Sequence, residues 1–255
     1  MNIFGKYADL YDSLYQDKDY IGECDAVAEI FKKYSKNKIS SILDLGCGTG
    51  NHAFILQERG YKILGIDRSK VMLANAEKKL TNLLDKKNIR LAKGDIRSWR
   101  SKEKFDSVIM MFAVLGYQLE NKDVLQAFST VRAHLNPGGI FIFDVWYGPA
   151  VLTQKPSKRT KSVVTTKGKI IRNAYSEIDT VRQICTVHYL TSYIQNTKQI
   201  QKIKEDHQMR FFFPKELEFY LQAAGLKLLK LGAFPQWRKP PNEKTWNIFG
   251  IAKAV

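Results

Sequence analysis

The densest run of glycines in the chain follows a short apolar segment. Ser41–Leu45 predicts a strand, and Gly46-Cys47-Gly48-Thr49-Gly50 follows it directly. Glycines tolerate positive φ and let backbone amides approach a ligand without an intervening Cβ. Dinucleotide-binding proteins use the related GxGxxG spacing at the same point of a strand–turn–helix unit. The loop by itself therefore predicts a nucleotide-type ligand and leaves its identity open.

Three carboxylates accompany this loop. Asp44 precedes the first glycine by two residues, where it can orient the loop or meet the ammonium of a methionine moiety, which a pyrophosphate-binding loop does not require. Asp67 ends the next expected strand, where a carboxylate can accept both ribose hydroxyls. Asp95 follows the third, where it can accept from an adenine amino group while Met72 and Ile96 cover the ring. A helix N-cap or loop acid is the structural alternative for each.

The elements that must position these residues alternate short β-rich runs with longer helical stretches. This alternation over the first 150 residues predicts a parallel sheet with helices on both faces. Proline and glycine in Asn136-Pro137-Gly138-Gly139 stop the last of these helices. The expected strands are Ser41–Leu45, Lys62–Ile66, Ile89–Ala92, Phe105–Met111 and Ile140–Val145, and the expected helices are Asn51–Arg59, Lys70–Leu80 and Lys122–His134.

From about Lys158 to Phe213 the sequence becomes rich in β-branched and aromatic residues, which predicts an antiparallel layer inserted after the fifth strand. The expected strands of the layer are Ser162–Thr166, Lys169–Ile178, Val181–Ile194 and Ile200–Phe212. The parent sheet then resumes with a helix, Pro214–Ala224, and the strands Lys227–Leu231 and Trp246–Ala254.

We therefore expect an α/β protein with a Rossmann-like, doubly wound, seven-stranded sheet and an antiparallel β insertion after strand five. The expected division is residues 1–157 for N-terminal helices and the nucleotide-binding core, 158–213 for the insertion as a substrate-side layer, and 214–255 for the helix and strands that complete the sheet.

Composition narrows the class of protein. No apolar run reaches the roughly 20 residues that span a bilayer, and the N-terminus lacks a signal-peptide pattern, so we expect a cytoplasmic protein without a membrane partner. The three cysteines have no CxxC spacing and the four histidines are not paired at metal-ligand intervals, so neither a disulfide framework nor a metal is expected. The formal net charge of +16 comes largely from lysines that are dispersed along the sequence. Three interpretations of this charge stay open: a solvated lysine-rich surface, a nucleic-acid partner and a phosphate-bearing substrate.

The ordered motifs resemble the class I S-adenosylmethionine-dependent methyltransferases over roughly Ile42 to Val145. They are the loop with its preceding acid, Asp67, Gly94-Asp95, Phe105-Asp106 and the Leu135–Gly139 segment. The resemblance implies S-adenosylmethionine as cofactor, with S-adenosylhomocysteine as its product. The cofactor-binding residues expected on this reading are Tyr11, Tyr20, Asp44, Gly46, Cys47, Gly48, Gly50, His52, Asp67, Arg68, Met72, Asp95, Ile96, Met111 and Phe112.

The segment after the fourth strand, Met110–Tyr117, narrows the acceptor. It lacks the Asp/Asn-Pro-Pro-aromatic tetrad of amino-methyltransferases that act on DNA or glutamine side chains, and it lacks the Pro-Cys nucleophile needed for C5 methylation of pyrimidines. Short motifs elsewhere are similar to those of the nucleotide-sugar N,N-dimethyltransferases of aminosugar antibiotic pathways, a family that also has an antiparallel insertion after strand five. The motifs are Tyr7–Asp12, Lys18–Tyr20, Gly50–His52, Val114–Tyr117, Val145–Tyr147 and Val187–Tyr189, whereas the last 30 residues, with Trp237-Arg238-Lys239, depart from the family pattern.

This second resemblance implies methyl transfer to an amino group of a nucleotide-linked sugar. Tyr117 stands where the family places a His or Tyr that faces the acceptor nitrogen, and His188 is a second candidate for catalysis; ordinary packing roles are the alternatives for both. The expected substrate-binding residues are Tyr15, Trp146, Tyr147, His207 and Arg210.

Other acceptors remain alternatives to the aminosugar. They are a hydroxyl group of a sugar or small molecule and, less favoured, a nucleic acid. A protein that binds the cofactor without catalysis is a further alternative, and a homodimer is a candidate assembly.

Overall fold

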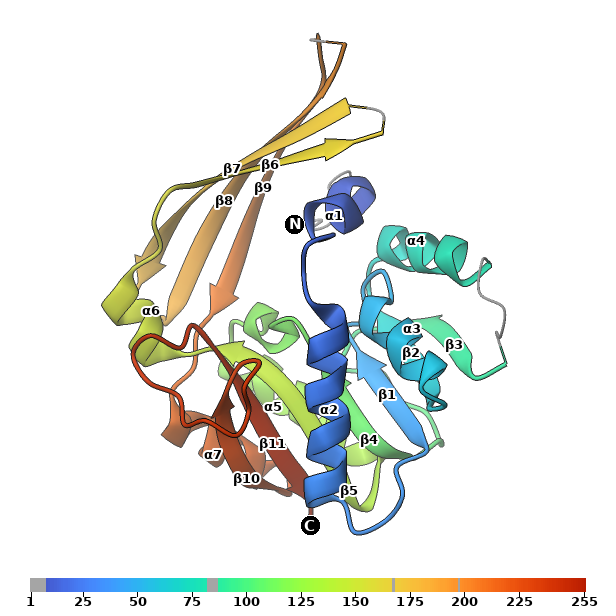
Figure 1. The fold of residues 1–255 in the computed structure, drawn as a ribbon. Helices are drawn as coiled ribbons and strands as arrows, with labels where there is room; N and C mark the ends of the chain where they lie inside the picture. Colours follow the sequence, from blue (N-terminus) through green and yellow to red (C-terminus); the bar gives the residue numbers. More distant parts are fainter. Residues whose placement is uncertain (1–7, 82–86, 167, 197) are drawn as a thin grey trace.

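Seven strands form the central sheet of the protein, for which a computed structural model describes residues 8–81, 87–166, 168–196 and 198–255 (Figure 1). Their order across the sheet is β10-β11-β5-β4-β1-β2-β3. The first five strands run parallel, whereas β11 is antiparallel to both of its neighbours. The strands are β1 Ser41–Leu45, β2 Lys62–Asp67, β3 Ile89–Lys93, β4 Phe105–Met110, β5 Leu135–Trp146, β10 Leu226–Ala233 and β11 Asn247–Ala254.

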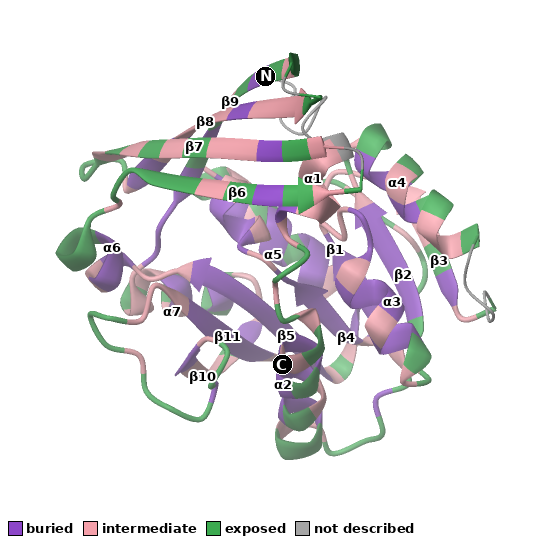
Figure 2. Ribbon diagram, turned by 45° about the horizontal axis from the view of Figure 1, so that its top comes forward, coloured by how far each residue is buried: buried purple, intermediate pink, exposed green. Residues whose placement is uncertain are grey.

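Helices cover both faces of this sheet, because its strands are apolar on both sides. Leu43 and Leu45 of β1 pack toward α5 and α7, and Ile42, which precedes them, packs toward α2 and α3. Figure 2 shows the resulting buried sheet between partly exposed helices. The helices are α1 Ala8–Leu14, α2 Tyr20–Tyr34, α3 Asn51–Glu58, α4 Lys70–Thr81, α5 Asn121–His134, α6 Gly148–Gln154 and α7 Pro214–Ala223, with the 3-10 turn η1 at Val114–Tyr117.

A second, four-stranded antiparallel sheet stands between α6 and α7 in the chain and projects over one end of the first (Figure 1). Its strands pair in sequence order. One end packs on α1, where Leu14 meets Val163, Ile170 and Ile203. The strands are β6 Arg159–Thr165, β7 Gly168–Asp179, β8 Ile184–Gln195 and β9 Lys198–Arg210.

The expected fold class is confirmed: the sheet has seven strands, is parallel apart from the β10–β11 edge, and carries an antiparallel insertion after the fifth strand. Most expected elements agree with the observed bounds to within one or two residues. The three-part domain division stays a prediction.

Two differences have clear causes. The Asn136–Gly139 segment lies inside β5, which begins directly after α5 ends, and it forms an irregularity between the pairs Phe105–Leu135 and Ser107–Ile140. The expected strand start at Val181 is wrong, because residues 180–183 form the β7–β8 turn. The Asp179 side chain accepts from the Arg182 amide there at 2.9 Å, and a solvent-exposed valine mimics a strand residue.

Candidate active site

A cavity of about 300 Å³ lies at the carboxyl ends of the parallel strands, beneath the inserted sheet. Strand order reverses between β1 and β4, and open α/β sheets bind ligands at such a switch point. The lining comes from α1, the glycine loop, the ends of β2 to β5, and β8 and β9. The predicted residues in it are Tyr11, Tyr15, Tyr20, Asp44, Gly46, Cys47, Gly48, His52, Asp67, Arg68, Met72, Asp95, Ile96, Met111, Phe112, Tyr117, Trp146 and His207.

The glycine loop forms the floor of this cavity. Gly46, Gly48 and Gly50 have φ of 82°, 56° and 81°, which only glycine adopts freely. A Cβ on Gly48 would meet nothing within 4 Å, so its backbone is open to a ligand, whereas one on Gly46 would stand 2.6 Å from Val114. Gly50 starts α3 and lies outside the lining; it shapes the loop without facing the cavity.

Asp67 is fixed at the end of β2 by two backbone amides. Its carboxylate accepts from Gly48 N at 2.9 Å and from Ser69 N at 2.7 Å. Burial raises the pKa of Asp67 above its usual value although these bonds act in the opposite direction. The carboxylate thus joins the glycine loop to the segment that leads into α4, and it retains acceptor capacity toward the cavity.

Asp44 is the buried acid beneath the loop, with 2 % of its surface exposed. Burial, and secondly the charge of Asp67, raise the pKa of Asp44 to about 7. Among the described residues, no side chain or backbone group donates a hydrogen bond to this carboxyl. A cationic group in the cavity would favour its charged form.

Asp95 stands at the far end of the cavity, beside Ile96. Arg97 donates to it from Nε at 2.9 Å and from the second terminal nitrogen at 2.7 Å, and the Arg97 amide adds a third bond at 2.9 Å. These hydrogen bonds from Arg97 lower the pKa of Asp95. The carboxylate is therefore charged and held in orientation, as an acceptor for a ligand amino group must be.

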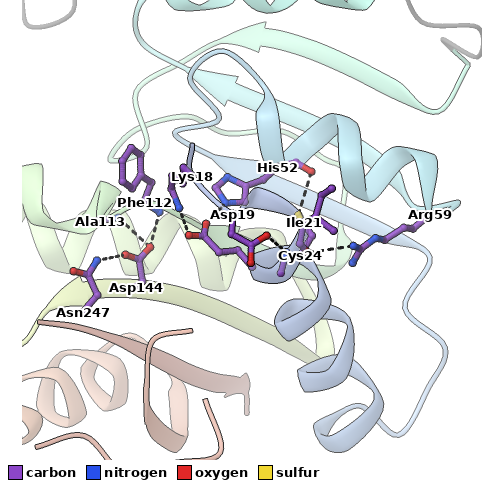
Figure 3. A network of polar contacts seen from close by, with 12 residues as sticks. Lys18, Asp19, Ile21, Cys24, His52, Arg59, Phe112, Ala113, Asp144 and Asn247 are labelled. Carbon is purple, nitrogen blue, oxygen red and sulfur yellow. Dashed lines mark hydrogen bonds and ion pairs between the residues drawn. The ribbon is translucent and has the colours of Figure 1, made fainter. Parts of the chain in front are cut away.

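The backbone after β4 is strained and is held by a buried carboxylate (Figure 3). Phe112 and Ala113 have φ of 73° and 55°. Their amides donate to Asp144 Oδ1 at 2.5 and 3.0 Å, and Asn247 Nδ2 donates to Oδ2 at 3.0 Å. Left-handed conformations cost non-glycine residues about 1–3 kcal/mol each, so they persist only where such contacts enforce them. Asp144 on β5 thus positions the Met111–Ala113 wall of the cavity.

A second buried network ties α2 to the start of α3 (Figure 3). Glu23 accepts from Lys18, and His52 Nε2 lies 2.7 Å from its other oxygen. Burial opposes ionisation of Glu23, but His52 and Lys18 together lower its pKa. The Lys18 ammonium lies 4.7 Å from the centre of the Phe112 ring, so the network also reaches the strained wall.

Asp12 of α1 clamps the glycine loop from above. It accepts from Thr49 Oγ1 at 2.7 Å and Asn51 Nδ2 at 3.2 Å, and pairs with Lys79 at 3.0 Å. Sequence reasoning did not assign this role, although Asp12 belongs to the quoted N-terminal motif; Tyr7 of that motif lies outside the described residues. The clamp brings the α1 tyrosines into the lining.

A chain of hydrogen-bonded polar side chains connects η1 with β9 at the wall of the cavity below the inserted sheet. The Tyr117 hydroxyl lies 2.9 Å from His207 Nδ1, and His207 Nε2 lies 3.0 Å from Glu205. Enclosure raises the pKa of Tyr117 well above its usual value. Tyr189 packs against His207 with ring centres 5.1 Å apart. Histidine, tyrosine and carboxylate therefore stand in series at the cavity wall.

The structure places four of the predicted residues outside the cavity lining, one of them Gly50. His188 lies between the lining residues Val187 and Tyr189, and because side chains alternate along a strand it faces the other side, where it pairs with Asp206 at 2.7 Å. Arg210 is buried in bonds to Asn121, Glu216 and Tyr220, and Tyr147 bridges to Phe212.

Residues that were not predicted as site residues complete the lining, although several of them belong to the motifs quoted from the sequence. They are Thr49, Asn51, Ser69, Gly94, Ala113, Val114, Gln118, Val187, Tyr189, Met209, Trp246 and Asn247. The role of Asp144 in holding the Phe112 and Ala113 amides was not predicted either. The one feature of the sequence that could have indicated it is that Asp144 is the single acid in the otherwise apolar run Ile140–Trp146.

These residues fit S-adenosylmethionine in chemistry and order along the cavity. The open backbone at Gly48 and the buried acid Asp44 suit a charged amino-acid portion, the amide-held Asp67 suits ribose hydroxyls, and Asp95 beside Ile96 suits an adenine.

Comparison with known proteins agrees with this fit. A family profile described as a methyltransferase domain matches residues 42–139. The dTDP-3-amino-3,4,6-trideoxy-α-D-glucopyranose N,N-dimethyltransferase of Streptomyces venezuelae is 28% identical over 91% of this chain and 94% of its own. A dTDP-3-amino-3,6-dideoxy-α-D-glucopyranose N,N-dimethyltransferase of Streptomyces fradiae is 27% identical over 92% and 89%.

Among solved structures, an S-adenosylmethionine-dependent methyltransferase from Clostridium acetobutylicum shares the fold, with a TM-score of 0.82 and 24% identity over 99% of both chains. The chain therefore contains a methyltransferase domain at residues 42–139 and is an enzyme of the methyltransferase class, and the residues that line its cavity fit S-adenosylmethionine as the methyl donor.

Proposed function

We propose that the protein methylates the amino group of a sugar linked to a nucleotide. The observation that carries this proposal is that two hollows share part of their lining: the aromatic cavity at the glycine loop and a second one lined by lysines. An acceptor amine beside the methyl donor, joined to an anionic group a short distance away, matches that arrangement. The two Streptomyces relatives, which align over nine tenths of this chain, are named for aminosugar acceptors of this kind.

The aromatic end suits an amine. Tyr11, Tyr15, Trp146 and Tyr189 face the cavity near the Met111–Ala113 wall. Desolvation disfavours an ammonium and so favours the neutral amine that can attack. The aromatic faces also attract a sulfonium cation. S-adenosylmethionine, when bound, supplies an electrophilic methyl group, and the residues of this chain contribute alignment and exclusion of water.

The lysine-lined end suits a diphosphate. The second hollow, of about 560 Å³, shares Tyr15, Phe112, Trp246 and Asn247 with the cavity and adds lysines at 18, 161 and 244. Lys161 pairs with Asp17 and Lys18 with Glu23. Within the described part of the chain, Lys244 has no ion-pair partner, which suits it to an anionic ligand.

The basic pair Arg238-Lys239 stands elsewhere and does not contribute to this second hollow. Arg238 stacks on Trp237 and pairs with Glu29 of α2. It lines neither hollow.

Mass spectrometry with paired acceptors tests the proposal. The protein is incubated with S-adenosylmethionine and either a dTDP-aminosugar or the matching sugar with a hydroxyl in place of the amine. We expect one or two methyl groups on the amine and none on the hydroxyl analogue. Methylation confined to the hydroxyl analogue, or to an added oligonucleotide, would refute the proposal.

A lysine variant tests the nucleotide end. Lys244→Ala should raise the KM for the nucleotide sugar severalfold and leave the affinity for S-adenosylmethionine unchanged, because the anion loses a charged partner. Lys169→Ala, on the inserted sheet and outside both hollows, is the matched control.

Two finer expectations remain part of this proposal: a cytoplasmic location and a homodimer. Among the described residues, no helix is long and apolar enough to cross a membrane.

A further inference from the structure

We propose that Glu205 is a positioning residue that, through His207, turns the Tyr117 hydroxyl into a hydrogen-bond acceptor for the substrate amine and opens a proton path out of the cavity. The inference rests on the proposed function, since it assigns the proton that an amine must lose before it can accept a methyl group.

The alternation of β9 places the two partners on the inner face. Glu205, His207 and Met209 are two residues apart, and the last two line the cavity, so Glu205 shares their side of the strand. Its side chain is 11% exposed and that of His207 is 5% exposed. A carboxylate so enclosed requires a donor, and His207 Nε2 at 3.0 Å supplies one.

This contact fixes the tautomer of His207. An ionised carboxylate only accepts hydrogen bonds, so the imidazole carries its proton on Nε2 and presents a lone pair at Nδ1. The Tyr117 hydroxyl, 2.9 Å away, must then donate to Nδ1. A tyrosine oxygen that donates its proton can also act as an acceptor, in this case for the N–H of an amine.

The same series of groups balances a proton transfer. An N–H bond of the substrate ammonium breaks and its proton goes to the Tyr117 oxygen, while the hydroxyl's own proton passes to His207 Nδ1. The nitrogen keeps the electron pair, and the resulting imidazolium is paired with Glu205. The raised pKa of Tyr117 disfavours a free phenolate, which is consistent with the two protons moving together. Glu205, whose side chain is more exposed than that of His207, then hands the proton to solvent.

Other charged and titratable groups lie near this series. Tyr189 of β8 packs on the imidazole, and Arg172 of β7 lies 4.8 Å from the centre of the Tyr189 ring and donates to the Tyr15 hydroxyl. Tyr15 after α1 and Arg68 after β2 interact electrostatically with Tyr117. Arg68 opposes accumulation of a proton at Tyr117, so Glu205 provides the negative charge that draws the proton onward.

The outer face of the same hairpin offers a matched control. His188 pairs with Asp206 at 2.7 Å and stacks on Tyr175, which reproduces a histidine–carboxylate pair away from the cavity. Glu205→Gln and Asp206→Asn therefore make the same chemical change on opposite faces of one strand, β9.

Kinetics of the two variants test the proposal. Glu205→Gln should lower kcat by roughly 10- to 100-fold, which is less than the roughly 10²- to 10⁴-fold of direct general acid–base assistance because Glu205 acts through His207. The KM for the aminosugar and the affinity for S-adenosylmethionine should change by less than about twofold, because the amide keeps the shape of the carboxylate. Asp206→Asn should leave all three values unchanged. An unchanged kcat in Glu205→Gln, or an equal loss in Asp206→Asn, would overturn the proposal.

Nitrogen-15 NMR of the histidines tests the arrangement without substrate. The His207 signals, assigned by their loss in His207→Phe, should show a neutral ring protonated on Nε2. Protonation on Nδ1 would overturn the assignment of Tyr117 as an acceptor. If the ring is protonated on Nε2 but the unaltered protein methylates no aminosugar, the proposed function is wrong. The direction of the hydrogen bond, from the Tyr117 hydroxyl to His207 Nδ1, would still be supported.

Discussion

Burial of Asp44 lowers the stability of the ligand-free protein by a free energy that follows from the pKa of this residue. Its pKa is raised from 3.8 to about 7, with burial as the main cause. The charged form is thus disfavoured in the folded state: the penalty is absent below pH 3.8, grows as the pH rises from 3.8 to 7, and is complete above 7. At about 1.4 kcal/mol per pKa unit, the raised pKa costs the ligand-free protein about 4 kcal/mol at pH 8, where folded Asp44 is mostly ionised, and about 2 kcal/mol at pH 5, where the carboxyl takes up a proton on folding.

Asp44→Asn removes the charge and keeps the shape. Urea unfolding of the ligand-free protein should therefore show a gain in stability that is larger at pH 8 than at pH 5. Asp106→Asn, on the neighbouring strand β4, is a control that should lower the stability instead of raising it. Burial raises the pKa of Asp106, but hydrogen bonds from Ser40 and Ser41 outweigh this effect and lower the pKa, so the charge of Asp106 is stabilising.

The same substitution should weaken binding of the cofactor. A cationic amino-acid portion next to Asp44 stabilises the carboxylate, so Asp44→Asn should raise the Kd for S-adenosylmethionine at least about 10-fold, or 1.4 kcal/mol. Binding to the unaltered protein should release protons near pH 7, which calorimetry in buffers of different ionisation enthalpy measures. A variant that is less stable at pH 8, or that binds the cofactor as before, would refute this account of Asp44.

Four further substitutions test the site. Asp67→Ala should abolish measurable cofactor binding by calorimetry, because the ribose loses its carboxylate; unchanged affinity would mean that the adenosine lies elsewhere. Tyr117→Phe should lower kcat and leave cofactor affinity intact, and an equal loss of both would move Tyr117 out of the acceptor site. Asp144→Ala leaves three donors unpaired and should cost roughly 2–4 kcal/mol in urea unfolding; a loss below about 1 kcal/mol would show that the strained turn holds itself. Asp12→Ala should raise the cofactor Kd severalfold with little loss of stability, and a wild-type Kd would show that the α1 clamp is dispensable.

Local patterns predicted the parts of the site that lie close together in the chain. The strand, the glycine loop and Asp44 occupy ten consecutive residues, and glycine's tolerance of positive φ is a property of the residue itself. Asp67 ends β2, which pairs with β1, and Asp95 follows β3, which pairs with β2, and parallel pairing brings such strand ends to one edge of the sheet. The cofactor side of the cavity could therefore be predicted before the fold was known.

Contacts between distant segments could not be predicted in this way. Asp144 meets Phe112 and Ala113 across 32 and 31 positions, and Asp12 meets Thr49 across 37. A single carboxylate in a strand carries no sign of the amides it will accept from, since those belong to another element.

The two candidate histidines of the inserted sheet show most clearly what the sequence determines and what the tertiary structure decides. Residue type and strand propensity made His188 and His207 comparable candidates, and the sequence by itself determined that a histidine would stand on each of two neighbouring strands. Only the tertiary structure decided which of them faces the cavity, because that depends on which side of the β8–β9 hairpin packs over the core. The register pairs Val187 with His207, so the inner face carries His207 and the outer face His188.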